Sequence, residues 1–99
     1  MILQLTLTAE RDLDSISRYL NERNPTASAR VRDAIVSSMR NLVDLPNIGR
    51  ELSPQVRRIV VPKFGYLIYY MVLQQQGEIS ILSIRHPSRQ RIEEDDLTP

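Results

Sequence analysis

The sequence predicts an α+β fold in which a hairpin of two helices packs on a small, largely antiparallel sheet. Two observations predict it. Apolar residues recur at helical spacing through residues 9–45, and three extended runs rich in β-branched and aromatic residues then follow one another through residues 56–84. A short alternating run at the start supplies one more strand. The expected order of elements is therefore β-α-α-β-β-β.

The first half of the chain holds one predicted strand and both predicted helices. Residues 1–6 alternate apolar and polar side chains, as a half-buried strand does. Thr8 is the candidate N-cap of a helix that runs to about Arg23. Asn24-Pro25 ends that helix and begins the second, because Asn caps well and Pro is favoured at the first helical position. The second helix ends before Pro46, and the near absence of a linker makes the pair fold back as a hairpin.

The second half holds three predicted strands, at residues 56–61, 66–73 and 79–84. The middle run is almost continuously apolar, which indicates a central strand covered on both faces. Its tyrosines could stack on nucleic-acid bases, but their apolar surroundings favour core packing for Tyr66, Tyr69 and Tyr70. Tyr19, on the first predicted helix, is expected to flank the same core.

Composition excludes several classes of protein. The chain has 99 residues, which suits a single domain, expected at residues 1–91. It contains no cysteine and one histidine, so disulfides are excluded, and we expect no metal and no cofactor. No apolar run approaches the roughly 20 residues of a membrane span, and the N-terminus lacks a signal-peptide layout. We therefore expect a cytoplasmic protein with no membrane partner.

The formal charge of +1 conceals a strong segregation. Residues 1–49 carry equal numbers of basic and acidic side chains, whereas residues 50–91 carry seven basic side chains against two acidic ones. Residues 92–99 hold four acidic side chains and no basic one, and we expect them to form a disordered tail. A positive region of this kind favours an anionic partner.

Basic side chains gather at the ends of the predicted strands. The candidate contacts to an anionic partner are Arg57, Arg58, Lys63, Arg85, His86 and Arg89. Alternation places Arg57 and Arg58 on opposite faces of their strand, so only one of them shares a face with Arg85. His86 has the one side chain whose ordinary pKa lies near neutrality, which makes it the candidate for proton transfer. The alternatives are solvated edge charges that oppose aggregation and a structural histidine.

The order of these patterns resembles the ParE branch of the RelE/ParE superfamily of bacterial toxins from toxin–antitoxin pairs. The resemblance covers roughly residues 6–91 and runs through residues 9–13 with Ile16 and Tyr19, Asn24-Pro25, Leu45-Pro46, Gly49-Arg50, Arg57-Arg58, residues 66–70, residues 79–82, and His86 with Arg89. Each piece is a common pattern. Their order and spacing across nearly the whole chain carry the resemblance.

The resemblance implies a toxin that a co-expressed antitoxin neutralises. ParE-like members are associated with poisoning DNA gyrase, and RelE-like members cleave messenger RNA in the ribosome. A nuclease here would use Arg58, Arg85, His86 and Arg89, but its second proton-transfer group is missing, because no tyrosine follows Tyr70 and the carboxylates after Arg91 lie in the expected tail. This favours a non-enzymatic gyrase inhibitor. A ribosome-dependent ribonuclease, without a metal, and an inactive homologue kept as an antitoxin-binding module are the alternatives.

The antitoxin is expected to lay an amphipathic helix along the helix hairpin and to add a strand to an exposed sheet edge. Apolar surface left uncovered by the hairpin would drive this association. The sequence assigns no individual residue to that contact.

Overall fold

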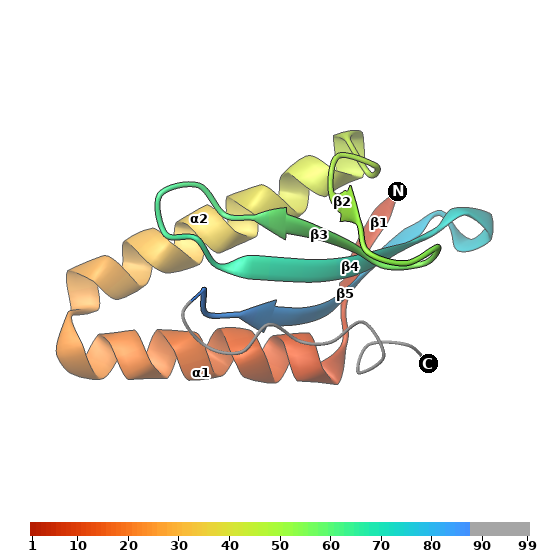
Figure 1. Cartoon of the computed structure of the whole chain (residues 1–99). Helices are drawn as coiled ribbons and strands as arrows, with labels where there is room; N and C mark the ends of the chain where they lie inside the picture. The colour runs from red at the N-terminus through yellow and green to blue at the C-terminus, as the bar shows by residue number, and fades with distance from the viewer. Residues whose placement is uncertain (88–99) are drawn as a thin grey trace.

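The protein consists of two helices packed on a five-stranded mixed sheet, as a computed structural model shows (Figure 1). The structure describes residues 1–87. The elements are β1 (Ile2–Leu5), α1 (Leu7–Arg23), α2 (Pro25–Asp44), β2 (Arg50–Glu51), β3 (Arg57–Val60), β4 (Leu67–Leu73) and β5 (Glu78–Arg85), with a short 3₁₀ turn at Gln74–Gln76 between the last two strands. Arg89 and the acidic segment 92–99 lie outside the described residues.

The strand order across the sheet is β1-β5-β4-β3-β2. β1 pairs in parallel with β5, and the other neighbouring strands are antiparallel. The predicted α+β class and helix hairpin are confirmed, and β4 lies centrally as its apolar run indicated. The expected cover on both faces differs, because α1 and α2 pack on one face of β4 and Leu67 and Tyr69 are buried on the other without them. Strand β2 was not predicted, because two residues are too short to show a periodicity.

The start of α1 differs from the prediction. Thr6, not Thr8, is the N-cap, and its hydroxyl oxygen accepts a hydrogen bond from the backbone N–H of Ala9 at 3.1 Å. The physical reason lies in the sheet. The Thr6 N–H donates to the carbonyl of Ile81 at 3.0 Å and its hydroxyl donates to the carbonyl of Leu82 at 3.0 Å. These two bonds hold Thr6 extended beside β5, so the helix begins at the next residue.

Asn24 joins the two helices as the sequence predicted. Its backbone N–H donates to the carbonyl of Leu20, and its side-chain oxygen accepts from the N–H of Ala27 at 3.2 Å. One residue therefore ends α1 and caps α2, with Pro25 at the first helical position. Neither helix within residues 1–87 has the length and apolarity that a bilayer crossing requires.

The main core lies between the helices and one face of the sheet. Leu13 of α1 and Ile35 and Leu42 of α2 pack with Ile68 and Ile81 of the central strands. Burying such side chains is worth about 2 kcal/mol each, which makes this contact the principal source of stability.

The aromatic side chains divide between core and surface. The predicted burial of Tyr66, Tyr69 and Tyr70 is confirmed. The expectation for Tyr19 was wrong, because its side chain is 46% exposed and the guanidinium of Arg23 lies 3.7 Å from its ring centroid. A cation–π contact one turn along the helix thus replaces the expected core contact.

Candidate functional site

One face of the sheet is not covered by α1 or α2, and Figure 1 looks onto it, with α2 behind the strands. We call it the open face. Its apolar part is a second, smaller cluster in which the buried residues Val56, Leu67 and Tyr69 pack with the partly buried Leu52, Met71 and Leu82. Alternation along each strand adds Arg50, Arg58, Val60 and Arg85 to the same side. The open face therefore combines three arginines with an apolar centre.

Strand register brings two of these arginines directly opposite each other. Arg50 of β2 pairs with Arg58 of β3, and Arg58 in turn lies opposite Tyr69 of β4. Like charges at directly opposite positions of an antiparallel pair are destabilising, since their Cβ atoms lie only about 5 Å apart. Arg50 is exposed, so solvent and salt screen part of this repulsion, and the pair concentrates positive charge on the open face.

Arg85 extends the same cationic surface across the sheet. It lies opposite Leu67, two residues before Tyr69, the partner of Arg58 on β4. Among residues 1–87, its buried Nε has no hydrogen-bond partner, and neither does the hydroxyl of the fully buried Tyr69. Buried polar atoms are normally satisfied by protein or by ordered water, so these two atoms are exceptions within residues 1–87.

Arg57 lies on the other side of β3 and holds a loop. Its Nη1 donates to the carbonyl of Asn47 at 3.2 Å and to that of Gly49 at 2.8 Å. Tyr70 holds the same loop, because its hydroxyl donates to the carbonyl of Pro46 at 2.8 Å and accepts from the N–H of Gly49 at 2.9 Å. The predicted separation of Arg57 from Arg58 is confirmed, and it is Arg58 that shares a face with Arg85.

The phenol of Tyr70 is electrostatically distinct from an exposed tyrosine. Burial raises its pKa above the ordinary value of 10.0, and the hydrogen bond from Gly49 and the positive charge of Arg57 oppose part of that rise. The phenol is therefore neutral at physiological pH and able to donate its hydrogen bond.

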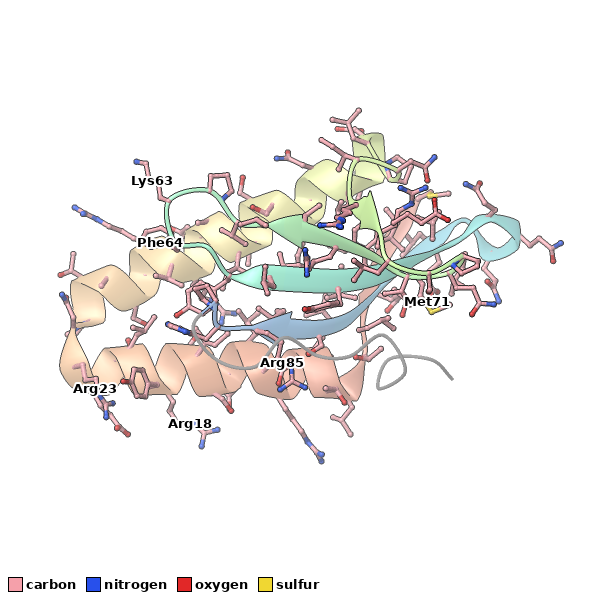
Figure 2. The ribbon with its side chains drawn as sticks, in the orientation of Figure 1. Arg18, Arg23, Lys63, Phe64, Met71 and Arg85 are labelled. Carbon is pink, nitrogen blue, oxygen red and sulfur yellow. The ribbon has the colours of Figure 1, made fainter. Side chains whose placement is uncertain are left out.

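Lys63 and His86 lie at the end of the sheet where β3 turns into β4. Lys63 has a positive φ of 72°, and its side chain extends away from the fold (Figure 2). His86 meets Tyr66 edge-on, with ring centroids 5.3 Å apart and ring planes at 89°. Alternation after Arg85 turns His86 toward the helix side of the sheet. The structure therefore does not bring His86 together with the arginines of the open face.

Five of the six residues singled out in the sequence thus occupy three places. Arg58 and Arg85 share the open face, Arg57 belongs to the loop beside Gly49, and Lys63 and His86 lie at the β3–β4 turn; Arg89 is outside the described residues. The sequence did not indicate Arg50 as a contact, because only the pairing of β2 places it beside Arg58. No group of three or more metal-ligating side chains occurs within residues 1–87.

The fold and the cationic open face define a small toxin of the RelE/ParE type. The model of the family described as "ParE toxin of type II toxin-antitoxin system, parDE" matches residues 3–91. The chain therefore belongs to the ParE toxin family of type II toxin–antitoxin systems.

Individual relatives agree with this assignment. The chain is 31% identical over 90 residues to Toxin RelE1 and 32% identical over 91 residues to Toxin RelE3, both of Caulobacter vibrioides. These matches cover 88% and 90% of this chain and 94% and 97% of the relatives. A chain of the chromosomal ParDE system from P. aeruginosa superposes with a TM-score of 0.74 at 27% identity, covering 87% of this chain and 95% of that one. The isolated E. coli RelE toxin shares the fold, with a TM-score of 0.70 at 14% identity over 96% of this chain and 93% of that one.

Proposed function

We propose that this toxin acts by binding DNA gyrase through the open face and that a cognate antitoxin neutralises it. Membership of the ParE family supports both partners. The chain resembles one from a ParDE pair, and the E. coli RelBE complex of toxin and antitoxin shares the fold with a TM-score of 0.68 at 15% identity, covering 89% of this chain and 98% of that one. Arg50, Arg58 and Arg85 are the principal contacts, and Lys63 and His86 at the β3–β4 turn are additional contacts outside the open face. Arg89, which lies outside the described residues, stays a predicted contact.

The observation that carries the proposal is the chemistry of the open face. A metal-independent ribonuclease needs a base and an acid within reach of the phosphate, in addition to cations. Within residues 1–87 the open face presents arginines and apolar side chains at its centre. Its carboxylate, Glu78, lies seven residues before Arg85 on β5, about 23 Å away along the strand.

The proton-transfer groups described at the end of β5, His86 and Asp12, are engaged in other contacts. His86 packs against Tyr66, and one carboxylate oxygen of Asp12 accepts from the hydroxyl of Ser83 and from the N–H of Ile84. A face with fixed cations and no adjacent acid–base pair among the described residues is suited to binding. It is less suited to cleaving RNA.

A supercoiling assay with purified gyrase tests the proposal. The antitoxin-free toxin should inhibit supercoiling of relaxed plasmid DNA, and Arg58→Glu and Arg85→Glu should each reduce this inhibition by about tenfold or more, since charge reversal replaces attraction by repulsion. Arg11→Glu, on the exposed surface of α1, is the matched control and should inhibit like the wild type. No inhibition by the folded wild-type protein would reject gyrase as the target.

Arg50→Glu separates function from stability on the same face. It converts the like-charged pair with Arg58 into an opposite-charged one, so the free energy of unfolding should rise by about 0.5 kcal/mol. Inhibition of gyrase should nevertheless fall. A variant that is more stable and equally inhibitory would remove Arg50 from the binding surface.

A ribosome-dependent ribonuclease is the second candidate, because the two Caulobacter vibrioides relatives are named RelE toxins and the donors of three arginines suit phosphate groups. Primer extension on ribosome-bound messenger RNA should then show new 5′ ends that disappear in His86→Ala. Intact messenger RNA in the presence of the wild-type toxin rules this out. Healthy growth during induced expression of folded protein would indicate an inactive, antitoxin-binding homologue.

A further inference from the structure

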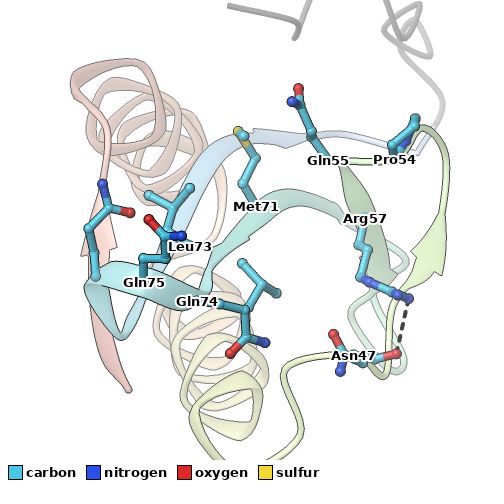
Figure 3. Close-up of a pocket in the computed structure, with 10 residues that line it drawn as sticks. Asn47, Pro54, Gln55, Arg57, Met71, Leu73, Gln74 and Gln75 are labelled. Carbon is cyan, nitrogen blue, oxygen red and sulfur yellow. Dashed lines mark hydrogen bonds between the residues drawn. The ribbon is translucent and has the colours of Figure 1, made fainter.

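A hollow of about 430 Å³ lies beside Arg57, at the border of the open face, with which it shares Met71 (Figure 3). The β4–β5 turn forms one wall, and the loops around Asn47 and Gln55 form the other. Arg57 is the one charged side chain among the residues that line it. The lining is otherwise amide and apolar, so the chemistry of the hollow depends on that guanidinium.

The guanidinium of Arg57 is fixed on one side and open on the other. Both hydrogen bonds that it makes within residues 1–87 use Nη1, which donates to the carbonyls of Asn47 and Gly49. Nη2 lies 3.9 Å from a carboxylate oxygen of Glu51, too far for a hydrogen bond, and the Glu51 side chain is 59% exposed. The edge formed by Nε and Nη2 therefore keeps its parallel donors, which match the two oxygens of a carboxylate.

The amides around this guanidinium suit the backbone of a peptide. Gln55, Asn47 and the turn Gln74–Gln76 line the hollow. Each amide side chain both donates and accepts hydrogen bonds, as the peptide groups of an extended segment require. Three successive glutamines in a turn stabilise no core, because all three are exposed.

An apolar floor completes the hollow. Met71 and Leu73 of β4 are partly buried and contribute to the lining, and Figure 3 shows them between the Gln-rich turn and Arg57. An apolar side chain next to an acidic one on a bound peptide would rest on this floor while the acid met the guanidinium.

We propose that this hollow binds an acidic side chain carried by an extended segment of the cognate antitoxin. The site borders the open face at Met71 but is centred on Arg57, and it rests on the antitoxin partnership of the proposed function but not on the choice of gyrase. A single cation among amides distinguishes it from a phosphate-binding surface, which would gather several cations along the path of a nucleic-acid backbone. The occupant is therefore a peptide carboxylate.

The site is tested by charge variants that leave Arg57 and its hydrogen bonds to Asn47 and Gly49 intact. The probe is the full-length antitoxin encoded beside the toxin gene, and the measurement is its dissociation constant from the full-length toxin at two salt concentrations. Gln75→Glu places a competing carboxylate on the wall and should weaken binding about fivefold. Glu51→Gln removes the existing carboxylate near Nη2 and should strengthen binding about threefold. Both effects should shrink at high salt.

Gln4→Glu is the matched control, because Gln4 is exposed on β1 and does not line the hollow. Its antitoxin affinity should equal that of the wild type. Equal affinities for all four proteins, or changes of the same sign in Gln75→Glu and Glu51→Gln, would overturn the proposal. Failure of the wild-type toxin to bind the antitoxin would instead contradict the partnership itself.

An NMR titration separates peptide from nucleic acid. The side-chain Nε–H resonance of Arg57 should shift on addition of antitoxin and stay unchanged with a 12-nucleotide single-stranded RNA. A response to the RNA alone would assign the hollow to nucleic acid and reject the peptide site.

Discussion

Asp12 of α1 accepts a hydrogen bond from Ser83 of β5, just beyond the point where strand β1 ends. One carboxylate oxygen of Asp12 accepts from the hydroxyl of Ser83 at 2.8 Å and from the backbone N–H of Ile84 at 3.0 Å. β1 pairs with β5 only as far as Ile81, so the N–H of Ile84 would otherwise be left at an uncovered strand edge. The helix thereby continues the hydrogen bonding that the short parallel strand cannot provide.

Removing the Asp12 carboxylate should therefore destabilise the fold. Asp12→Ala leaves two partly buried donors without their acceptor, and we expect a loss of about 2 kcal/mol in the free energy of unfolding. Urea denaturation measures it. Asp14→Ala on the same helix is the control, because Asp14 makes only an exposed ion pair with Arg18 and should cost about 0.5 kcal/mol or less. Equal losses in the two variants would contradict a special role for Asp12.

Gly49 is required by a close approach. A Cβ built there would lie 2.6 Å from the hydroxyl oxygen of Tyr70 and 3.0 Å from the carbonyl oxygen of Arg58. Gly49→Ala must displace the loop or the phenol, and we expect a destabilisation of about 2 kcal/mol by thermal denaturation. The combination of Gly49→Ala with Tyr70→Phe should cost less than the sum of the two single changes, since both disturb one contact. If the losses in free energy of unfolding were additive, the two changes would disturb different contacts, and the clash at Gly49 would not involve the Tyr70 hydroxyl.

The raised pKa of Tyr70 predicts a loss of stability at high pH. The folded state holds the phenolic proton more tightly than the unfolded chain, so this contribution is complete below the unfolded pKa of about 10 and disappears as pH rises through the folded value. The free energy of unfolding should fall more steeply above pH 10 in the wild type than in Tyr70→Phe. Parallel pH profiles for the two proteins would show that Tyr70 does not titrate differently on folding.

Lys63 combines backbone strain with a proposed contact to the target. Its φ of 72° disfavours a residue with a Cβ, so Lys63→Gly should raise the free energy of unfolding by about 0.5–1 kcal/mol. Inhibition of the target should weaken at the same time. Lys63→Asn, which removes the charge but tolerates the left-handed region, should show the same functional loss. Full inhibition by both variants would remove Lys63 from the contact surface.

The sequence by itself determined the helices and strands that depend on interactions between residues close together in the chain. Helical periodicity, the Asn24-Pro25 junction and the apolar run of β4 predicted the helix hairpin and the central strand, because spacing and capping act over a few residues. Alternation also separated Arg57 from Arg58 correctly. The family resemblance followed from the order of these same local patterns.

Only the tertiary structure decided which charges act together. Strand register placed Arg50 beside Arg58, turned His86 toward Tyr66 and fixed Arg57 on the loop beside Gly49. It also moved the helix cap to Thr6, through hydrogen bonds to residues more than seventy positions away. The physical reason is that pairing between distant strands depends on long-range backbone hydrogen bonds, which leave no periodic signal in the residues that they join.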